Sequence, residues 1–211
     1  MKRILIADDH SIVRQGLNLV LQQHLPNYTF DEAWDAETVM GQLKEHTYEL
    51  VLLDLNMPDT DPSILMHWIK SFYPGTRMLI LSMNDETFFG LRSIQLGAKG
   101  YLKKDAPSED IIAAVQAVLA GKKYVSPELA DLILNSTLDG KPVNPFERLS
   151  AREFQVAMYI VQDYSVKQIS EMLQLQYATV NTFKQRIYEK LEVTHRKDLV
   201  QLASAYSFSG K

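Results

Sequence analysis

Acidic, hydroxyl and amine side chains follow four short apolar runs in the first half of this 211-residue chain. Asp8 and Asp9 follow KRILIA, Asp54 lies near the end of ELVLLDL, Ser82 lies near the end of RMLILSM, and Lys104 ends GYLKK. If these runs are neighbouring parallel strands, their carboxyl ends meet at one edge of a sheet. Three carboxylates at one edge repel one another, and at least one pKa rises unless a cation joins them. Mg²⁺ suits such a place, because it accepts carboxylate, carbonyl and water oxygens and leaves positions for phosphate.

A carboxylate beside Mg²⁺ can attack phosphorus and form an aspartyl phosphate. A nearby hydroxyl and ammonium can then bind the other phosphoryl oxygens, which supplies the positioning and electrostatics that phosphoryl transfer requires. Each residue alone has a simpler explanation, as a helix cap, a turn residue or a solvated charge. Their joint placement at four strand ends favours the phosphoryl site. The five scattered histidines and the absence of cysteine give no spacing typical of a zinc site.

The elements that position these residues alternate between two hydrophobic periods over residues 1–124. Short apolar runs predict strands, and the longer segments between them have the spacing of helices. The predicted strands cover 2–7, 29–34, 49–55, 77–83 and 100–104. Strands that alternate with helices predict a parallel sheet covered on both faces, with right-handed crossovers. We expect an α/β, flavodoxin-like, doubly wound five-stranded sheet with the strand order 2-1-3-4-5 and its site outside the carboxyl ends of the strands.

The pattern changes after residue 124. Ser126-Pro127-Glu128 begins a short helix, and the segment 136–147, rich in turn formers, is typical of a linker. From residue 148 the pattern is helical only, with capping boxes at Ser150–Glu153 and Ser165–Gln168. A tight turn precedes a helix over 178–191, which favours a helix-turn-helix. The predicted domains are 1–124, a linker with a short helix over 125–147, and an all-α four-helix domain over 148–211.

Composition narrows the function classes. The chain carries a net charge of −4, with 46% hydrophobic and 23% charged residues, as folded proteins do. The absence of cysteine excludes disulfide scaffolds and cysteine nucleophiles. No apolar run approaches the roughly 18 residues of a membrane span, and the first residues lack the pattern of a signal peptide. We therefore expect a cytoplasmic protein without membrane contact. Residues 1–124 carry a net charge of −4 and residues 146–211 carry +2, which suggests two domains with different partners.

The predicted helix over 178–191 has side chains suited to double-stranded DNA. The N-terminal residues of a recognition helix meet base edges, while cations meet phosphates. Asn and Gln can pair with adenine, and the Thr methyl group can contact thymine. An amphipathic surface helix with solvated charges remains the alternative for this segment alone. The polar side chains of interest are Asn181, Thr182, Lys184, Gln185, Arg186 and Lys190.

Four segments of the first domain resemble the receiver domain of two-component response regulators. They are IADDHSIVRQGL (6–17), LLDLNMPDTD (52–61), LILSMND (79–85) and KGYLKKD (99–105). The first of these is most similar to the NarL/FixJ subfamily. The resemblance implies a partner sensor histidine kinase, whose phosphohistidine supplies the phosphoryl group.

The resemblance also implies a role for each motif residue. Asp54 would be the phospho-acceptor; Asp9, Asp54 and the backbone carbonyl of Asn56 would hold Mg²⁺, and Asp8 would act through water. Ser82 would be the switch hydroxyl, Lys104 the conserved-type lysine and Tyr101 the switch aromatic. On phosphorylation Ser82 would move toward the phosphate and Tyr101 would swing inward, as a two-state shift. Pro62 departs from the glycine usual in this loop and should stiffen it.

Residues 149–193 resemble the LuxR-type output domain, with its L-S-x-R-E opening and its T-V…K-L helix. The match implies base contacts by Asn181, Thr182 and Gln185, and phosphate contacts by Thr179, Lys184 and Lys190. Four residues depart from the family: Gln176 at a usual Ser or Thr cap, Asn181 at a frequent Lys, Phe183 at a frequent His, and Asp163 at a frequent Gly. We expect weak monomer binding and a homodimer through the last helix (196–206), which reads inverted half-sites.

The predicted function is that of a two-component response regulator, in which phosphorylation of Asp54 controls dimerisation and sequence-specific DNA binding and thereby transcription. We expect no enzyme activity beyond self-dephosphorylation. An alternative is a Mg²⁺-dependent phosphatase or hydrolase with an aspartyl nucleophile, or an FMN-binding sheet. The D-x-D-x-T string of one phosphatase class and glycine-rich nucleotide loops are absent. A further alternative is a partner-binding signalling module whose DNA-reading face has decayed.

Overall fold

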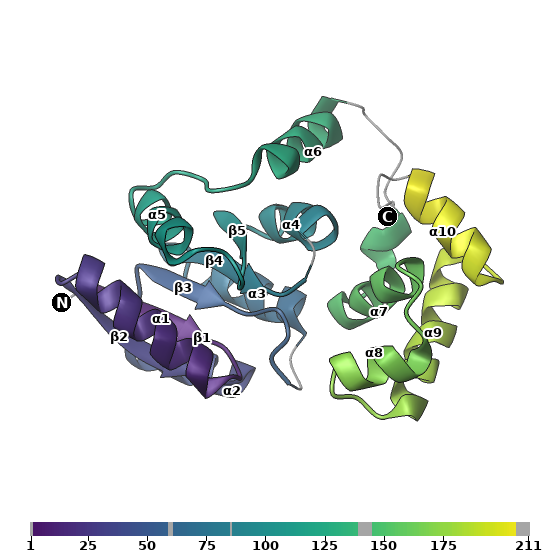
Figure 1. Ribbon diagram of the computed structural model, residues 1–211, viewed down its shortest axis with the longest axis horizontal. Helices are drawn as coiled ribbons and strands as arrows, with labels where there is room; N and C mark the ends of the chain where they lie inside the picture. The colour runs from purple at the N-terminus through teal and green to yellow at the C-terminus, as the bar shows by residue number, and fades with distance from the viewer. Residues whose placement is uncertain (1, 59–60, 85, 139–144, 206–211) are drawn as a thin grey trace. The chain divides into compact units, whose positions relative to one another are not determined.

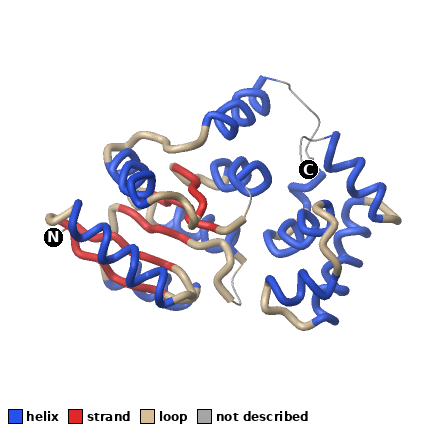
Figure 2. Tube along the Cα trace, viewed as in Figure 1, coloured by secondary structure: helices blue, strands red, loops and turns tan. Residues whose placement is uncertain are grey.

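The structure is a computed structural model that describes residues 2–58, 61–84, 86–138 and 145–205. The chain divides into two compact units, Met1–Asn135 and Ser136–Lys211, and each is described by itself. The first combines strands and helices, while the described part of the second contains helices only (Figure 2). Among the described residues, no helix has the length and apolar character needed to cross a membrane.

The first unit contains one five-stranded parallel sheet. Its strands are β1 (Lys2–Ala7), β2 (Tyr28–Ala33), β3 (Leu50–Leu53), β4 (Arg77–Ser82) and β5 (Gly100–Lys103). Their order is β2-β1-β3-β4-β5, and every pair is parallel, which confirms the predicted topology. Strand β3 is buried on both faces, as expected of a central strand in a doubly wound sheet.

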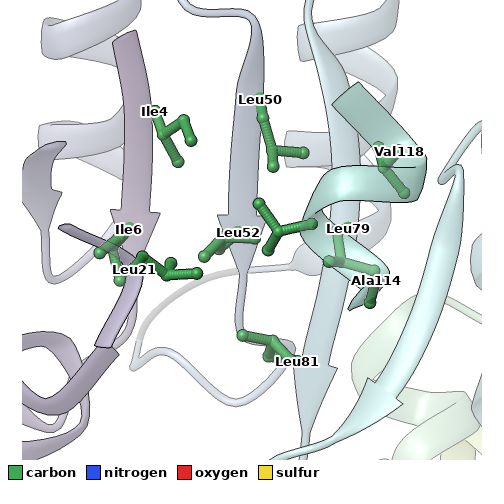
Figure 3. Close-up of a cluster of buried hydrophobic side chains, with 10 residues drawn as sticks. Ile4, Ile6, Leu21, Leu50, Leu52, Leu79, Leu81, Ala114 and Val118 are labelled. Atoms are coloured by element: carbon green, nitrogen blue, oxygen red, sulfur yellow. The ribbon is translucent and has the colours of Figure 1, made fainter. Parts of the chain in front are cut away.

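Five helices connect and cover the strands (Figure 1). They are α1 (Ser11–His24), α2 (Ala36–Glu45), α3 (Pro62–Phe72), α4 (Glu86–Gln95) and α5 (Ser108–Leu119). Helices α1 and α5 cover one face of the sheet. Figure 3 shows Leu21 of α1 and Ala114 and Val118 of α5 beside the strand residues Ile4, Ile6, Leu50, Leu52, Leu79 and Leu81. This close-packed apolar core makes the sheet a rigid base for its carboxyl edge.

Helix α6 (Pro127–Leu138) follows α5 and packs on α4. It begins where the Ser-Pro-Glu pattern predicts, and the Ser126 hydroxyl accepts a hydrogen bond from the Leu129 N–H at 3.1 Å. Leu129 is 1% exposed and lies against Gly90 of α4.

The second unit is built from η1 (Pro145–Arg148), α7 (Ala151–Val161), α8 (Val166–Met172), α9 (Tyr177–Leu191) and α10 (Arg196–Ala205). Both predicted capping boxes are present, at the starts of α7 and α8. Its core includes Phe146 and Phe154, whose rings meet edge to face at 6.2 Å between centroids. Val180 and Ile187 of α9 are buried, so the opposite side of this helix is left to solvent.

Candidate functional site

The carboxyl ends of four strands place the predicted polar residues at one edge of the sheet. Asp8 follows β1, Asp54 follows β3, Ser82 ends β4 and Lys104 follows β5. Backbone hydrogen bonds extend past the strands: the Asp54 N–H donates to the Ala7 carbonyl at 2.9 Å, and the Lys104 N–H donates to the Ser82 carbonyl at 3.1 Å. The sheet therefore fixes the main chain of these residues before any side chain interacts.

Lys104 joins two of the carboxylates. Its Nζ lies 2.6 Å from Oδ2 of Asp8 and 2.9 Å from Oδ2 of Asp54. The side chains of Asp8 and Asp54 are almost completely buried, and that of Lys104 is nearly so. One ammonium thus partly neutralises two buried carboxylates, and a net negative charge remains.

The electrostatic environment leaves Asp54 poised to change its protonation state. Burial raises the pKa of Asp54 to about 6, although the ammonium of Lys104 opposes the rise, and the charge of Asp8 adds to it. Burial alone would lower the pKa of Lys104, but the two carboxylates raise it above its ordinary value. Lys104 therefore stays charged at neutral pH. A second cation beside Asp54 would stabilise its ionised form and lower its pKa.

The side chains present fit a divalent cation. Oδ1 of Asp9 and both carboxylate oxygens of Asp54 are buried. The cation beside Asp54 is the ammonium of Lys104, 2.9 Å from Oδ2, which Asp54 shares with Asp8. Asp8, Asp9 and His10 each offer a ligand atom, and these atoms all lie within 4.8 Å of one another. A cluster of buried carboxylate oxygens whose negative charge one ammonium only partly neutralises is the kind of donor set that Mg²⁺ binds.

Two residues that sequence reasoning left without a role position Asp8. The His10 N–H donates to Oδ1 of Asp8 at 2.9 Å, and the Arg14 guanidinium donates to the Asp8 carbonyl at 2.7 Å and to Glu32 at 2.8 Å. The His10 ring also lies close to the cluster, with Nδ1 2.7 Å from Oδ1 of Asp9. In the sequence, His10 is not part of a histidine spacing typical of a metal site. Its ring comes close to Asp9 in the turn between β1 and α1.

Ser82 and Tyr101 are connected through Asn84. The Asn84 N–H donates to the Ser82 hydroxyl at 3.2 Å, and the Tyr101 hydroxyl donates to the Asn84 carbonyl at 3.0 Å. The Asn84 side-chain amide also donates to Oδ1 of Asn56 at 3.1 Å. Tyr101 is only 1% exposed, so its ring already lies inside the protein in this structure. An inward swing on phosphorylation would therefore start from a ring that is already buried.

The predicted base-reading residues lie on the solvent side of α9. Asn181, Thr182 and Gln185 are exposed. Their polar groups bond within the helix: the Asn181 amide to the Tyr177 carbonyl at 3.3 Å, the Thr182 hydroxyl to the Ala178 carbonyl at 3.0 Å, and the Gln185 amide to Glu189 at 3.3 Å. These local bonds are weak at an exposed surface, so the groups can exchange them for base edges.

The predicted phosphate contacts differ in their surroundings. Thr179 is half-buried, and the ammonium of Lys184 lies 5.6 Å from the centroid of the Tyr188 ring. Lys190 instead forms an ion pair with Glu153 of α7, with 2.6 Å between Nζ and Oε2. A DNA phosphate at Lys190 would have to compete with the buried carboxylate of Glu153. The sequence of α9 alone does not indicate this partner.

Two of the sequence departures have visible structural consequences. Gln176 provides no side-chain cap at the start of α9, as predicted. Asp163 has a left-handed backbone with φ of +72°, the conformation that glycine adopts at low cost. Its carboxylate forms an ion pair with Arg196 at 2.8 Å, and the same guanidinium donates to the carbonyls of Ile160 and Val161 at 2.9 and 3.4 Å. These bonds attach the start of α10 to the end of α7.

Comparison with known proteins identifies both units. Residues 4–116 match the response regulator receiver domain family, and residues 147–203 match the LuxR family of bacterial regulatory proteins. The chain is a response regulator. It is 32% identical over 208 residues to the oxygen regulatory protein NreC of Staphylococcus carnosus, which covers 95% of this chain and 96% of NreC. It is 33% identical over 204 residues to the response regulator GacA of Pseudomonas aeruginosa, covering 96% and 95%.

These relatives belong to the NarL/FixJ family, as the first motif predicts. The fold is also that of RcsB from Salmonella enterica serovar Typhimurium bound to promoter rprA, with a TM-score of 0.60, 24% identity and coverage of 96% of this response regulator and 98% of RcsB. The chain therefore combines a receiver with a LuxR-type DNA-binding domain, and its family consists of transcription regulators rather than typical enzymes. The phosphatase and flavin alternatives gain no support from either match.

Proposed function

We propose that Asp54 of the receiver accepts a phosphoryl group from a sensor histidine kinase and that this modification controls dimerisation and DNA binding. The observation that carries the proposal is the environment of Asp54: a buried carboxylate, with a pKa raised to about 6, held 2.9 Å from the ammonium of Lys104 at the edge of a parallel sheet. A carboxylate of this kind is a nucleophile that a cation and an ammonium keep ionised.

In the proposed reaction an oxygen of Asp54 attacks phosphorus, and the bond from phosphorus to the imidazole nitrogen of the kinase breaks. The electron pair leaves with the imidazole, which takes up a proton. Lys104 and the Ser82 hydroxyl bind oxygens of the transferred group, so they stabilise the charge that Asp54 acquires. Self-dephosphorylation by water is the only turnover that we propose.

Asp9, Asp54 and the backbone carbonyl of Asn56 would hold Mg²⁺, and Asp8 would act through water. The ion supplies charge neutralisation that lets a phosphoryl group approach the carboxylates. The His10 N–H and Lys104 each hold one oxygen of Asp8. The protein therefore orients the Asp8 side chain, which suits a carboxylate that contacts the ion through a water molecule.

For the second unit we propose a homodimer that binds double-stranded DNA in the cytoplasm. Asn181, Thr182 and Gln185 would contact bases, and Thr179, Lys184 and Lys190 would contact phosphates. The solvent exposure of the first three and the LuxR-family match support this assignment. RcsB, which shares the fold, has been solved as dimers bound to DNA. Helix α10 would form the dimer contact, and inverted half-sites would follow from the twofold symmetry.

The acceptor assignment is tested by labelling the purified chain with radioactive acetyl phosphate or a phosphorylated histidine kinase in the presence of Mg²⁺. We expect Asp54→Asn to abolish labelling of the acyl-phosphate type, which is recognised because hydroxylamine removes it. Asp110→Asn, at an exposed position of α5, serves as the matched control and should label as the wild type does. Undiminished label in Asp54→Asn would refute the assignment.

A further inference from the structure

His10 lies in the turn between β1 and α1 and occupies the N-cap position of α1. Its side chain forms no capping hydrogen bond there, although a Ser, Thr, Asp or Asn at this position would accept one from the first turn of the helix. The side chain is also 55% exposed, so it contributes little to the packing of the receiver. Neither helix capping nor burial therefore explains a histidine at this position.

A ring nitrogen of His10 lies beside the two acidic residues that precede it. Nδ1 is 2.7 Å from Oδ1 of Asp9 and 3.4 Å from Oδ1 of Asp8. The backbone supports this arrangement, because the His10 N–H donates to Oδ1 of Asp8 at 2.9 Å. One imidazole and two carboxylates thus offer ligand atoms that all lie within 4.8 Å of one another.

These separations suit ligands of a single ion. A donor atom on Mg²⁺ or Zn²⁺ is about 2.1 Å from the metal, so two donors on the same ion are about 3–4 Å apart. The distances from Nδ1 to the two carboxylates lie close to this range. Lys104 uses a different oxygen, because its Nζ lies beside Oδ2 of Asp8, whereas His10 lies beside Oδ1. An ion beside His10 therefore need not displace the ammonium of Lys104.

An imidazole changes which ions such a site prefers. Carboxylate, carbonyl and water oxygens suit Mg²⁺, whereas imidazole nitrogen suits transition ions such as Co²⁺, Ni²⁺ and Zn²⁺. We propose that His10 is a ligand of the divalent ion beside Asp8 and Asp9, and that its nitrogen makes the site favour first-row transition ions over Mg²⁺ more strongly than the carboxylates alone do. His10 thereby adds a ligand and a class of ions to the metal site of the proposed function, on which this inference rests.

Pulsed electron paramagnetic resonance with bound Mn²⁺ tests the ligand directly, because an imidazole nitrogen on the ion produces a characteristic coupling. The full chain, prepared without a histidine tag, should show this coupling. His10→Asn should lose it while the protein stays folded, because Asn is a favoured N-cap residue for α1. His24→Asn, at the exposed last position of the same helix, is the matched control and should keep the coupling.

Calorimetric titrations of the same three proteins with Mg²⁺ and with Co²⁺ measure the preference between ions. We expect His10→Asn to lower the affinity for Co²⁺ by about tenfold or more, and the affinity for Mg²⁺ by less than about threefold, because only Co²⁺ gains strongly from nitrogen. His24→Asn should change neither affinity.

Three results would overturn the assignment of His10. They are an absent imidazole coupling in the wild type, a coupling that survives in His10→Asn, and equal losses of Co²⁺ and Mg²⁺ affinity in His10→Asn. His10 would then be an ion-pair partner of Asp9 only. The proposed function fails in a different way: a chain that binds Mn²⁺ through nitrogen but is not labelled on Asp54 would refute the phospho-acceptor and retain the ligand. Failure to bind any of these ions would overturn both.

Discussion

Asp54 shows how one buried residue combines stability and reactivity. Burial and the neighbouring charge of Asp8 raise the pKa of Asp54 more than the ammonium of Lys104 lowers it, so ionisation in the folded state costs more than in the unfolded chain. A neutral residue at this position would make the folded protein more stable. The ionised Asp54 becomes favourable only when a cation binds beside it or a phosphoryl group is attached to it. This is the usual compromise between stability and activity at a functional site.

The raised pKa predicts a pH-dependent effect of Asp54→Asn on stability. Because the pKa is about 6 in the folded state and 3.8 ordinarily, the folded state binds the proton more tightly. The contribution of Asp54 is therefore most favourable below about pH 4 and is lost as the pH rises through about 6. We expect Asp54→Asn to raise the free energy of unfolding by about 1–3 kcal/mol at pH 7.5 and by less at pH 5.

Urea unfolding without divalent cations measures this difference. The only tryptophans are Trp34 and Trp68, so tryptophan fluorescence reports on the receiver alone. A stabilisation that is constant between the two pH values would contradict the cause assigned here.

A second prediction at the residue scale concerns base reading. Gln185→Ala should weaken binding by about 1–3 kcal/mol at one base-pair position and relax the preference there. Lys184→Ala should weaken binding to all sequences to a similar degree and reduce the salt dependence. Competition binding with single-base variants of a selected site, at two salt concentrations, distinguishes the two outcomes. An equal loss of affinity for every DNA sequence in Gln185→Ala would show that this residue contacts the DNA backbone instead of a base.

At the scale of elements, α7 and α9 are joined by a charge pair. Glu153 has a side chain that is 4% exposed and serves two purposes, because it closes the capping box of α7 and binds Lys190 of α9. Burial opposes ionisation of Glu153, but hydrogen bonds from Lys190 and Ser150 overcome it and lower the pKa. The position of the proposed recognition helix thus depends on a cap in another helix.

Lys190→Met should loosen the contact between α7 and α9. The substitution leaves the Glu153 carboxylate buried without its cation, and we expect a loss of about 1–2 kcal/mol because Lys190 is itself partly exposed. Hydrogen exchange in 151–161 and 177–191 should accelerate by roughly 5–30-fold. Lys167→Met, at an exposed position of α8, is the control. Equal exchange in both variants would show that the pair contributes nothing.

Sequence reasoning succeeded where a local pattern dictates a local structure. The order of the strands, the capping boxes at Ser150 and Ser165 and the missing cap at Gln176 follow from periodicity and from hydrogen bonding within a few residues. The convergence of Asp8, Asp54 and Lys104 also followed, because parallel strands share an edge. Their chemical roles remain proposals.

What the sequence could not provide are contacts between distant residues that no spacing encodes. Lys190 and Glu153 are 37 positions apart, and the bond between Asn84 and Asn56 spans 28. The inward position of Tyr101 depends on the Asn84 carbonyl, a main-chain atom that any residue type would present. Helix α6 was predicted as part of a linker, and only the close approach of Leu129 to Gly90 reveals that it packs on α4.

At the scale of the whole molecule, the two domains divide the tasks of receiving and reading a signal. We expect acetyl phosphate with Mg²⁺ to shift the mass of the chain from monomer toward dimer, and to tighten binding to inverted half-sites more than to a single half-site. Asp54→Asn should show neither change. Light scattering and binding-site selection measure both effects. Salt-insensitive or absent DNA binding by the phosphorylated dimer would favour the partner-binding alternative.

The guanidinium of Arg196 has a practical consequence for anyone who builds chimeras of this family. From the first position of α10 it donates to two carbonyls at the end of α7 and forms an ion pair with Asp163, which has a left-handed backbone. A transplanted last helix that lacks arginine at its start would lose its hydrogen bonds to the end of α7, and Asp163 would keep its left-handed backbone without a counterion. A chimera that exchanges the last helix should therefore take the residues at positions 163 and 196 from the same parent protein.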